Sequence, residues 1–319
     1  MKKYDVVALG ELLIDFTENG TSPQGNPLLE ANPGGAPCNV LAMLQKLGKK
    51  TAFIGKVGKD MFGNQLAEAV KSAGIDVSNL VRDENVSTTM VFVHTLPDGD
   101  REFSFVRNPG ADMMLTKDEI DAEIIKSAKI FHFGTLSSTH EGVRKATRYA
   151  IDIARESGAI ISFDPNLRPP LWNSLDDARV EIEYGLSKCD ILKISDNEIE
   201  FLTGSTDYDN AVREIMKKYG IKLAFATLGK KGSRAYFRNI KAECGGFKVD
   251  TIETTGAGDT FCGSALNYIL EHGMDNLTEK DLTELLTFAN AAAALVTARR
   301  GALRVMPDKS EVLELIERC

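Results

Sequence analysis

The chain is organised around one stretch, Thr254-Thr255-Gly256-Ala257-Gly258-Asp259-Thr260-Phe261, in which a loop of small residues runs into an apolar helix expected over residues 261–270. The backbone N–H groups of Gly256, Ala257 and Gly258 converge at the start of that helix, so we predict an anion hole there. Asp259 lies in the first helical turn, where the helix dipole keeps its carboxylate ionised and able to accept a proton from a hydroxyl group. An anion hole beside a base predicts phosphoryl transfer, unless these residues merely turn the chain and start the helix.

Composition narrows the class of protein. The 319 residues exceed the size at which one hydrophobic core usually stops growing, so we expect one large domain with an excursion, or two domains. Hydrophobic residues make up 43% and charged residues 26%, as in globular proteins, and no apolar run reaches the ~18 residues needed to span a membrane. The absence of a signal-like segment and of any CxxC pair among five cysteines predicts a cytoplasmic protein with free thiols. The net charge of −8 argues against a nucleic-acid partner.

Strands and helices alternate along most of the chain. We expect strands at residues 5–9, 51–57, 129–133, 159–163, 190–194 and 222–228, and helices at residues 40–47, 60–73, 140–157 and 288–300 in addition to the helix after the anion loop. This βαβ pattern predicts an α/β fold with a mostly parallel central sheet and helices on both faces. Neither a GxGxxG dinucleotide fingerprint nor a GxxxxGK[ST] P-loop occurs in the sequence.

Two β-rich runs interrupt the alternation. Residues 88–95 and 101–107 are joined by the turn Pro97-Asp98-Gly99-Asp100, and the second run sets Phe103 and Phe105 against Glu102, Ser104 and Val106. This pattern predicts a half-exposed hairpin. Beside it we expect an irregular, turn-rich segment at residues 17–32. We therefore predict that residues 1–16, 33–87 and 108–319 form an α/β catalytic domain, and that residues 17–32 and 88–107 form a small β lid.

Further loops at strand ends could bind a ligand. Gly34 and Gly35 let the backbone approach a ligand closely, and Asn39 follows in the first helical turn, where it could equally be a capping residue. The run from Asp164 to Trp172 leaves the carboxyl end of a strand, where parallel sheets usually bind ligands, although it could be a proline-stiffened loop. Ser195 and Glu198 form a Ser-x-x-Glu capping box, which by itself explains both residues structurally.

With these loops in this order, the chain resembles the ribokinase-type (PfkB) sugar kinases over essentially its whole length. The runs at residues 164–172 and 107–112 further resemble the fructokinase branch. The resemblance implies a ribokinase-like fold and a transferase that moves a phosphoryl group from ATP to a small-molecule sugar with the help of Mg²⁺. The expected reaction converts fructose to fructose 6-phosphate. Lids of this kind often pair between two chains, so a homodimer through the lid is also expected.

The resemblance also implies roles for residues at matching positions. Asp259 would be the catalytic base, and the N–H groups of Gly256, Ala257 and Gly258 would stabilise the transferring phosphate. The sugar side would comprise Asp15, Gly34, Gly35, Asn39, Arg168 and, from the lid, Arg107. The nucleotide side would comprise Asn166, Lys193, Thr227, Gly229, Gly232 and Asn290. Glu198 would place Mg²⁺ through water, and a site for K⁺ would involve Glu253, Thr255 and Gly301.

Two departures from the family pattern leave alternatives open. Ser195 replaces the Asn of an Asn-x-x-Glu motif, and Glu253 replaces the usual Asp of the cation loop, so activation by K⁺ is not implied. A kinase for 2-keto-3-deoxygluconate, a nucleoside or another sugar is the first alternative. A sugar- or nucleotide-binding regulator without turnover is the second, and the intact loop with Asp259 argues against it. A dehydrogenase is a poorer match because the dinucleotide fingerprint is missing.

Overall fold

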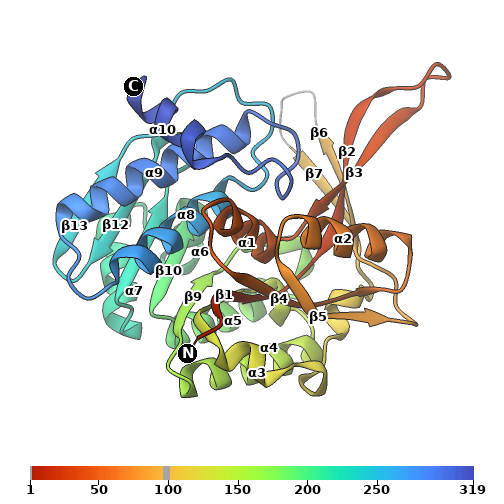
Figure 1. The fold of residues 1–319 in the computed structure, drawn as a ribbon, viewed down its shortest axis with the longest axis horizontal. Helices are drawn as coiled ribbons and strands as arrows, with labels where there is room; N and C mark the ends of the chain where they lie inside the picture. The colour runs from red at the N-terminus through yellow and green to blue at the C-terminus, as the bar shows by residue number, and fades with distance from the viewer. Residues whose placement is uncertain (1, 96–100) are drawn as a thin grey trace.

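A nine-stranded sheet forms the centre of the computed structural model, which describes residues 2–95 and 101–319 (Figure 1). The strand order is β13-β12-β11-β10-β9-β8-β1-β4-β5. Neighbouring strands from β5 to β11 are parallel, and β12 and β13 are added antiparallel at one edge, as expected for a mostly parallel sheet. The strands are β1 (Tyr4–Leu9), β4 (Thr51–Gly58), β5 (Asp76–Asp83), β8 (Ala128–Gly134), β9 (Ile160–Asp164), β10 (Ile191–Ser195), β11 (Leu223–Thr227), β12 (Ser233–Phe237) and β13 (Ile240–Cys244).

Helices cover both faces of this sheet. One buried cluster joins the sheet to α1, α2, α8, α9 and α10, and a second joins it to α3, α4, α5, α6 and α7. The helices are α1 (Ala36–Lys46), α2 (Met61–Ser72), α3 (Ala122–Lys126), α4 (Glu141–Glu156), α5 (Leu175–Lys188), α6 (Asp196–Thr203), α7 (Tyr208–Tyr219), α8 (Ala257–His272), α9 (Glu279–Thr297) and α10 (Lys309–Glu317). None of the helices in the described residues is both long and apolar enough to cross a membrane.

Two helices start earlier in the chain than the sequence pattern predicts. Helix α9, expected at residues 288–300, begins at Glu279 because Thr278 and Asp281 form a capping box at its start. The polar side chains of its first turns hid this half from an apolar pattern. Helix α8 begins at Ala257, inside the predicted anion loop, so the loop and the helix start are one structure.

A separate small sheet has the strand order β3-β2-β6-β7. Its strands are β2 (Leu13–Thr21), β3 (Pro27–Gly34), β6 (Met90–Thr95) and β7 (Arg101–Val106). The segment at residues 17–32 is therefore not irregular: β2 and β3 form an antiparallel hairpin that projects from the body of the molecule (Figure 1). β6 lies parallel beside the first half of β2, from Ile14 to Thr17, and so joins this hairpin to the rest of the small sheet. The turn predicted at residues 97–100 lies outside the described residues.

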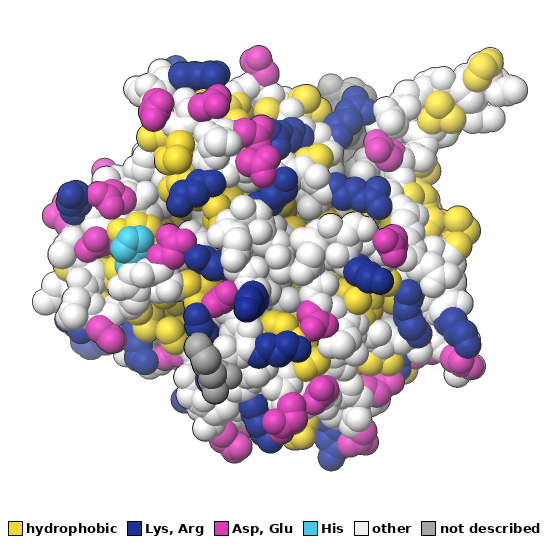
Figure 2. All heavy atoms as spheres, viewed as in Figure 1, with side chains coloured by type: hydrophobic (Ala, Val, Ile, Leu, Met, Phe, Trp, Pro, Cys, Tyr) yellow, Lys and Arg dark blue, Asp and Glu magenta, His cyan; other side chains and the backbone are white. Residues whose placement is uncertain are grey.

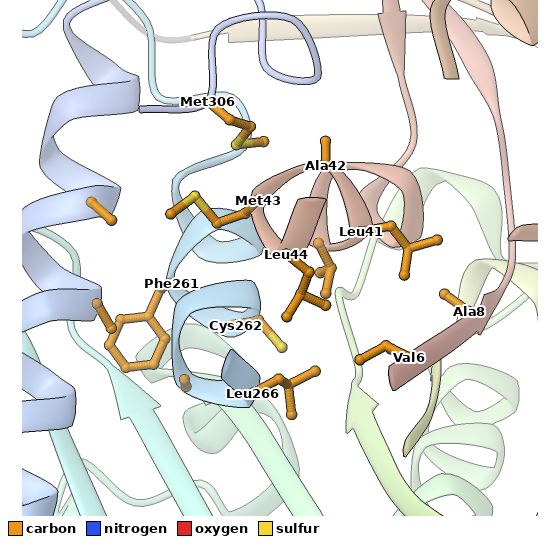
Figure 3. Packing of buried hydrophobic residues seen from close by; sticks show 14 of the residues in the cluster. Val6, Ala8, Leu41, Ala42, Met43, Leu44, Phe261, Cys262, Leu266 and Met306 are labelled. Atoms are coloured by element: carbon orange, nitrogen blue, oxygen red, sulfur yellow. The ribbon is translucent and has the colours of Figure 1, made fainter. Parts of the chain in front are cut away.

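The packing of α8 places the predicted anion loop beside the start of α1. Cys262 and Leu266 of α8 point toward Leu44 of α1 (Figure 3), while Phe261 packs edge-on against Phe225 of β11 at 5.8 Å between ring centroids. Helix α8 thus packs against both the sheet and α1, which lies beside it on the same face. The first turns of both helices, which carry Asp259 and Asn39, consequently meet at one site.

Candidate active site

The anion loop is shaped by two glycines, one that leaves no room for a side chain and one that lies in close contact with Lys193. Gly256 caps α8 with a φ of 79°, and a Cβ atom there would lie 2.6 Å from the Cβ of Ala302. A Cβ on Gly258 would lie 3.1 Å from Nζ of Lys193. The N–H of Ala257 donates to the carbonyl of Thr254 at 3.3 Å, so one of the three predicted amides already has a partner within the loop. The helix dipole favours an anion at this helix start.

Asp259 is hydrogen-bonded directly to a residue of α1. Nδ2 of Asn39 donates a hydrogen bond to Oδ2 of Asp259 at 2.8 Å, across 220 residues of sequence. Burial raises the pKa of Asp259 to about 6, and the hydrogen bond from Asn39 acts in the opposite direction. The carboxyl group is therefore ionised near neutral pH yet basic enough to accept a proton.

Lys193 lies beneath the anion loop and is paired with Asp164. Nζ of Lys193 is 3.0 Å from Oδ2 of Asp164, and both side chains are buried. Burial lowers the pKa of Lys193, but the carboxylates of Asp164 and Glu198 outweigh it and hold the pKa above its ordinary value. Lys193 is consequently a permanent positive charge next to Gly258.

The loop after β9 is folded onto Glu198. The backbone N–H of Asn166, a residue with a left-handed φ of 44°, donates to Oδ1 of Asp164 at 3.1 Å. The two carboxylate oxygens of Glu198 accept from the N–H groups of Leu167 and Ser195, each at 2.8 Å. The predicted capping box is thus present, and the same carboxylate also positions the loop that carries Arg168.

Asp15, predicted to bind the sugar, lies directly against Gly34. A Cβ on Gly34 would lie 2.1 Å from Oδ2 of Asp15, so only glycine leaves room for this carboxyl group. The pKa of Asp15 is raised to about 7. Burial is the main cause, the negative charge of Glu253 acts in the same direction, and the positive charge of Arg168 acts against both. The positive charge of Arg168, an exposed residue, also lowers the pKa of Asp259.

Arg107 is not a free side chain on the lid. It follows β7 directly, and its side chain is only 2% exposed. Nε and Nη2 donate to Oδ2 of Asp112 at 2.9 and 2.7 Å, Nη1 donates to the Thr139 hydroxyl, and Nη2 also donates to the carbonyl of Leu136. A direct contact with a sugar would require the guanidinium to leave these partners, which corrects the expectation that the lid presents it to the substrate.

The predicted nucleotide loop is a tight turn between β11 and β12. Gly229 and Gly232 have φ values of 55° and 95°, and the N–H of Leu228 donates to the carbonyl of Gly232 at 2.8 Å. Thr227 ends β11 at the start of this turn. The side-chain amide of Asn290 is already engaged, because it accepts from the Ser233 hydroxyl and donates to the carbonyls of Cys244 and Gly245 at the end of β13.

The predicted cation loop is closed by a contact within the protein. Oε2 of Glu253 accepts from the N–H of Gly301 at 3.0 Å, so the longer side chain reaches across the loop. The N–H groups of Ile252 and Glu253 both donate to the carbonyl of Thr297. Within residues 2–95 and 101–319, no group of three or more His, Cys, Asp or Glu side chains is placed to hold a metal ion.

Sequence reasoning missed Glu11, which is 4% exposed. Its Oε1 accepts from the N–H of Ala36 at 2.8 Å, at the start of α1, and burial raises its pKa to about 7. With His132, Asp164 and Asn166 it lines a cavity of about 10 Å³, which is the size of one water molecule. A charged residue directly after a buried strand, at Gly10-Glu11, was the available signal.

An ionisable carboxyl group beside a glycine-rich helix start, with a glycine turn on a mostly parallel sheet, is what a phosphoryl-transferring enzyme requires. The family model described as "pfkB family carbohydrate kinase" matches residues 3–309, and the chain belongs to that family. It is 42% identical over 316 residues to "Fructokinase-1" of Zea mays, and the match covers 98% of each protein.

Solved structures agree with this assignment. The fructokinase of Xylella fastidiosa with bound ATP has a TM-score of 0.89 and 31% identity, covering 100% of this chain and 99% of that one. The fructokinase of Vibrio cholerae O395 in its fructose, ADP and calcium ion bound form has a TM-score of 0.88 and 29% identity, covering 98% and 99%. The predicted ribokinase-like fold, the resemblance to fructokinases and the assignment as a sugar kinase are confirmed.

Proposed function

We propose that this carbohydrate kinase phosphorylates fructose with ATP to give fructose 6-phosphate, and that Asp259 is the catalytic base. The hydrogen bond between Asn39 and Asp259 carries the proposal, because it joins the helix on the sugar side to the helix that forms the anion hole. A hydroxyl group held by α1 would therefore meet the base and the anion hole together. The likeness to a fructokinase of Zea mays and to a fructose-bound fructokinase of Vibrio cholerae supports fructose as the sugar.

The chemistry divides among the residues of this chain. Asp259 orients the sugar hydroxyl and takes its proton while the hydroxyl oxygen forms a bond to the γ-phosphorus of ATP. The bond from this phosphorus to the oxygen that bridges to the β-phosphate breaks, and ADP leaves. General-base help of this kind is worth ~10²–10⁴ in rate. The N–H groups at the start of α8 face the negative charge that develops on the transferred phosphoryl group, and Lys193 adds a fixed positive charge below them. Holding acceptor and donor in line supplies the rest of the acceleration.

The donor side fits ATP with Mg²⁺. The open loop at Gly256 and Gly258 suits phosphate, and the glycine turn after β11 suits close approach by a nucleotide. Glu198 uses one lone pair on each carboxylate oxygen for backbone N–H groups, so lone pairs remain for a metal-bound water. Glu198 would hold Mg²⁺ through this water, and the metal would supply positive charge to offset that of the phosphates.

A neutral sugar fits the acceptor side better than an acid. Asp15 and Asn39 recognise hydroxyl groups, and Asp112 already neutralises the charge of Arg107. The second candidate, 2-keto-3-deoxygluconate, is favoured by one observation, the exposed guanidinium of Arg168 near Asp15 and Asp259. A site with buried polar partners left unpaired by the wrong sugar discriminates by orders of magnitude.

The test is a coupled assay of ADP release with fructose, ribose, 2-keto-3-deoxygluconate and adenosine at saturating Mg-ATP. We expect the highest kcat/KM with fructose. A higher value for the keto-acid sugar, lost in Arg168→Ala, would replace fructose by the acid as substrate. Absence of ADP release with every sugar would contradict a kinase function altogether.

The monovalent-cation site is a separate proposal. If Glu253 supports the cation loop as the family's aspartate does, K⁺ should raise activity above that in Na⁺, because the loop positions the amides that meet the phosphate. The contact from Glu253 to Gly301 also allows the opposite outcome, a loop already held internally. Equal rates in the two salts would show that K⁺ has no role.

The homodimer through the lid and the cytoplasmic location also stand as proposals. Leu28 and Leu29 of the projecting hairpin are 48% and 43% exposed, and hydrophobic side chains are visible along it in Figure 2. An exposed apolar β edge favours pairing with a second copy. Light scattering measures the molar mass in solution of the wild type and of the double variant Leu28→Ser/Leu29→Ser. If the lid forms the dimer interface, the molar mass of the variant should be half that of the wild type.

A further inference from the structure

We propose that Asp112 is a positioning residue of the sugar site, because one buried carboxylate holds both ends of the β6–β7 hairpin and, through them, Asp15. The inference rests on the proposed function, in which Asp15 binds the sugar. Asp112 itself belongs to neither the predicted sugar site nor the predicted nucleotide site. Its role is inferred from the contacts around it.

Both crossings between the large domain and the hairpin converge on this carboxylate. Thr89 directly precedes β6, and its hydroxyl donates to Oδ1 of Asp112. Arg107 directly follows β7, and its Nε and Nη2 donate to Oδ2 of Asp112 at 2.9 and 2.7 Å. Hydrogen bonds with a charged acceptor, and a guanidinium above all, are among the strong ones in proteins.

The same cluster is fastened to the large domain. Arg107 donates to the carbonyl of Leu136 and to the hydroxyl of Thr139, both in the segment after β8. The N–H of Ala111 donates to the carbonyl of Ser87 at 2.9 Å. The base of the hairpin is thereby fixed relative to the central sheet.

The cluster has no room to rearrange. A Cβ on Gly110 would lie 1.8 Å from the Thr89 hydroxyl and 2.9 Å from Oδ1 of Asp112. The side chains of Asp112 and Arg107 are each 2% exposed, so water cannot replace a lost partner without opening the fold. One arrangement of the hairpin base is therefore strongly favoured.

A short path leads from this base to the sugar side. The carbonyl of Thr89 accepts from the N–H of Ile14 at 3.1 Å, and β6 then runs parallel to β2 with Val91 opposite Asp15. Displacing Thr89 would therefore displace the backbone beside Asp15. Asp112 acts on substrate through this path rather than by contact.

The experiment compares Asp112→Asn with Glu181→Gln. Glu181 is a matched control because it is a buried carboxylate paired with Arg148 at 2.9 Å, its side chain is 4% exposed, and neither residue belongs to the small sheet. For whichever sugar the wild type phosphorylates, we expect Asp112→Asn to raise the sugar KM about tenfold, with the ATP KM changed less than about twofold. Glu181→Gln should change neither.

A second readout does not depend on activity. Hydrogen exchange at the Ile14 amide should be faster in Asp112→Asn than in Glu181→Gln, because that amide is bonded to Thr89. If Asp112→Asn does not fold, Thr89→Val removes one of the hydrogen bonds and should show the same pattern at smaller size. An unchanged sugar KM or Ile14 exchange rate in the folded variant overturns the proposal, whereas wild type that phosphorylates no sugar overturns the proposed function.

Discussion

At the residue scale, carboxyl groups at the site have pKa values above the ordinary range. Burial raises the pKa of Asp259 to about 6 and those of Asp15 and Glu11 to about 7. Perturbed carboxyl groups of this kind gather where a proton has to be exchanged. Among these three, Asp259 combines a raised pKa with a place at the start of a helix and a hydrogen bond that orients it.

Asp259→Asn should lower kcat at least ~10²-fold while sugar and ATP affinities stay within a few-fold, because the amide cannot take the proton. Steady-state kinetics with calorimetric binding measurements test this. Asp281→Asn is the matched control, since Asp281 also lies in the first turn of a helix. Activity above a tenth of wild type in Asp259→Asn would rule out the assignment as base.

The pH dependence should report the same carboxyl group. Because the base must be ionised, kcat/KM should fall about tenfold per pH unit below about pH 6, the pKa of Asp259. Asn39→Leu removes a hydrogen bond that lowers this pKa, so the acid limb should move to higher pH. An acid limb that stays in place in Asn39→Leu would mean that another group controls it.

At the element scale, function depends on where helices begin. Helices α1 and α8 each begin at a glycine with a positive φ, Gly35 at 129° and Gly256 at 79°. A Cβ on Gly35 would lie 2.5 Å from the carbonyl oxygen of Glu11. The two ligand loops are thus built by local backbone geometry together with close packing behind it.

Gly256→Ala should lower kcat more than tenfold, because the left-handed φ and the clash with Ala302 would shift the amides of the anion hole. Gly273→Ala is the matched control at the other end of α8: its φ is 77°, and a Cβ there meets nothing within 4 Å. Both changes should cost about 1 kcal/mol of stability from the positive φ alone. Equal kcat values for the two variants would show that the loop geometry is not critical.

At the scale of the whole molecule, the raised pKa values make stability depend on pH. In the unfolded chain an aspartate releases its proton near pH ~4, whereas Asp15 in the folded protein holds it to about pH 7. The stability from this group is therefore fully present below pH ~4 and is lost as pH rises through about 7. The site is accordingly expected to destabilise the fold at the pH where the enzyme works.

Asp15→Asn should therefore raise Tm relative to wild type, and by more at pH 8 than at pH 5, because the amide has no charge to bury. The difference between the two pH values should be about 2–4 °C if roughly 1 kcal/mol is relieved. Scanning calorimetry at both pH values measures it. A constant difference would mean that Asp15 titrates normally in the folded protein.

The features that could be predicted from the sequence depend on residues that are close together along the chain. Backbone N–H groups at a helix start can surround a phosphate where small residues precede the helix. Residues 254–261 have this pattern, and the anion hole was predicted from it. Alternation of strands and helices likewise fixes a parallel sheet through short-range handedness. The capping box at Ser195 and Glu198 was equally readable because its partners are three residues apart.

Contacts between side chains far apart in the sequence could be seen only in the folded structure. Asn39 and Asp259 are 220 residues apart, and their hydrogen bond exists because α1 and α8 pack together. From the sequence, Arg107 was predicted to reach the sugar from the lid, but in the structure it is buried and paired with Asp112. The pairing is needed because an unpaired buried charge would be costly. The parallel pairing of β2 with β6 is likewise decided by residues far apart in sequence, because Ile14 to Thr17 lie beside Met90 to Val93.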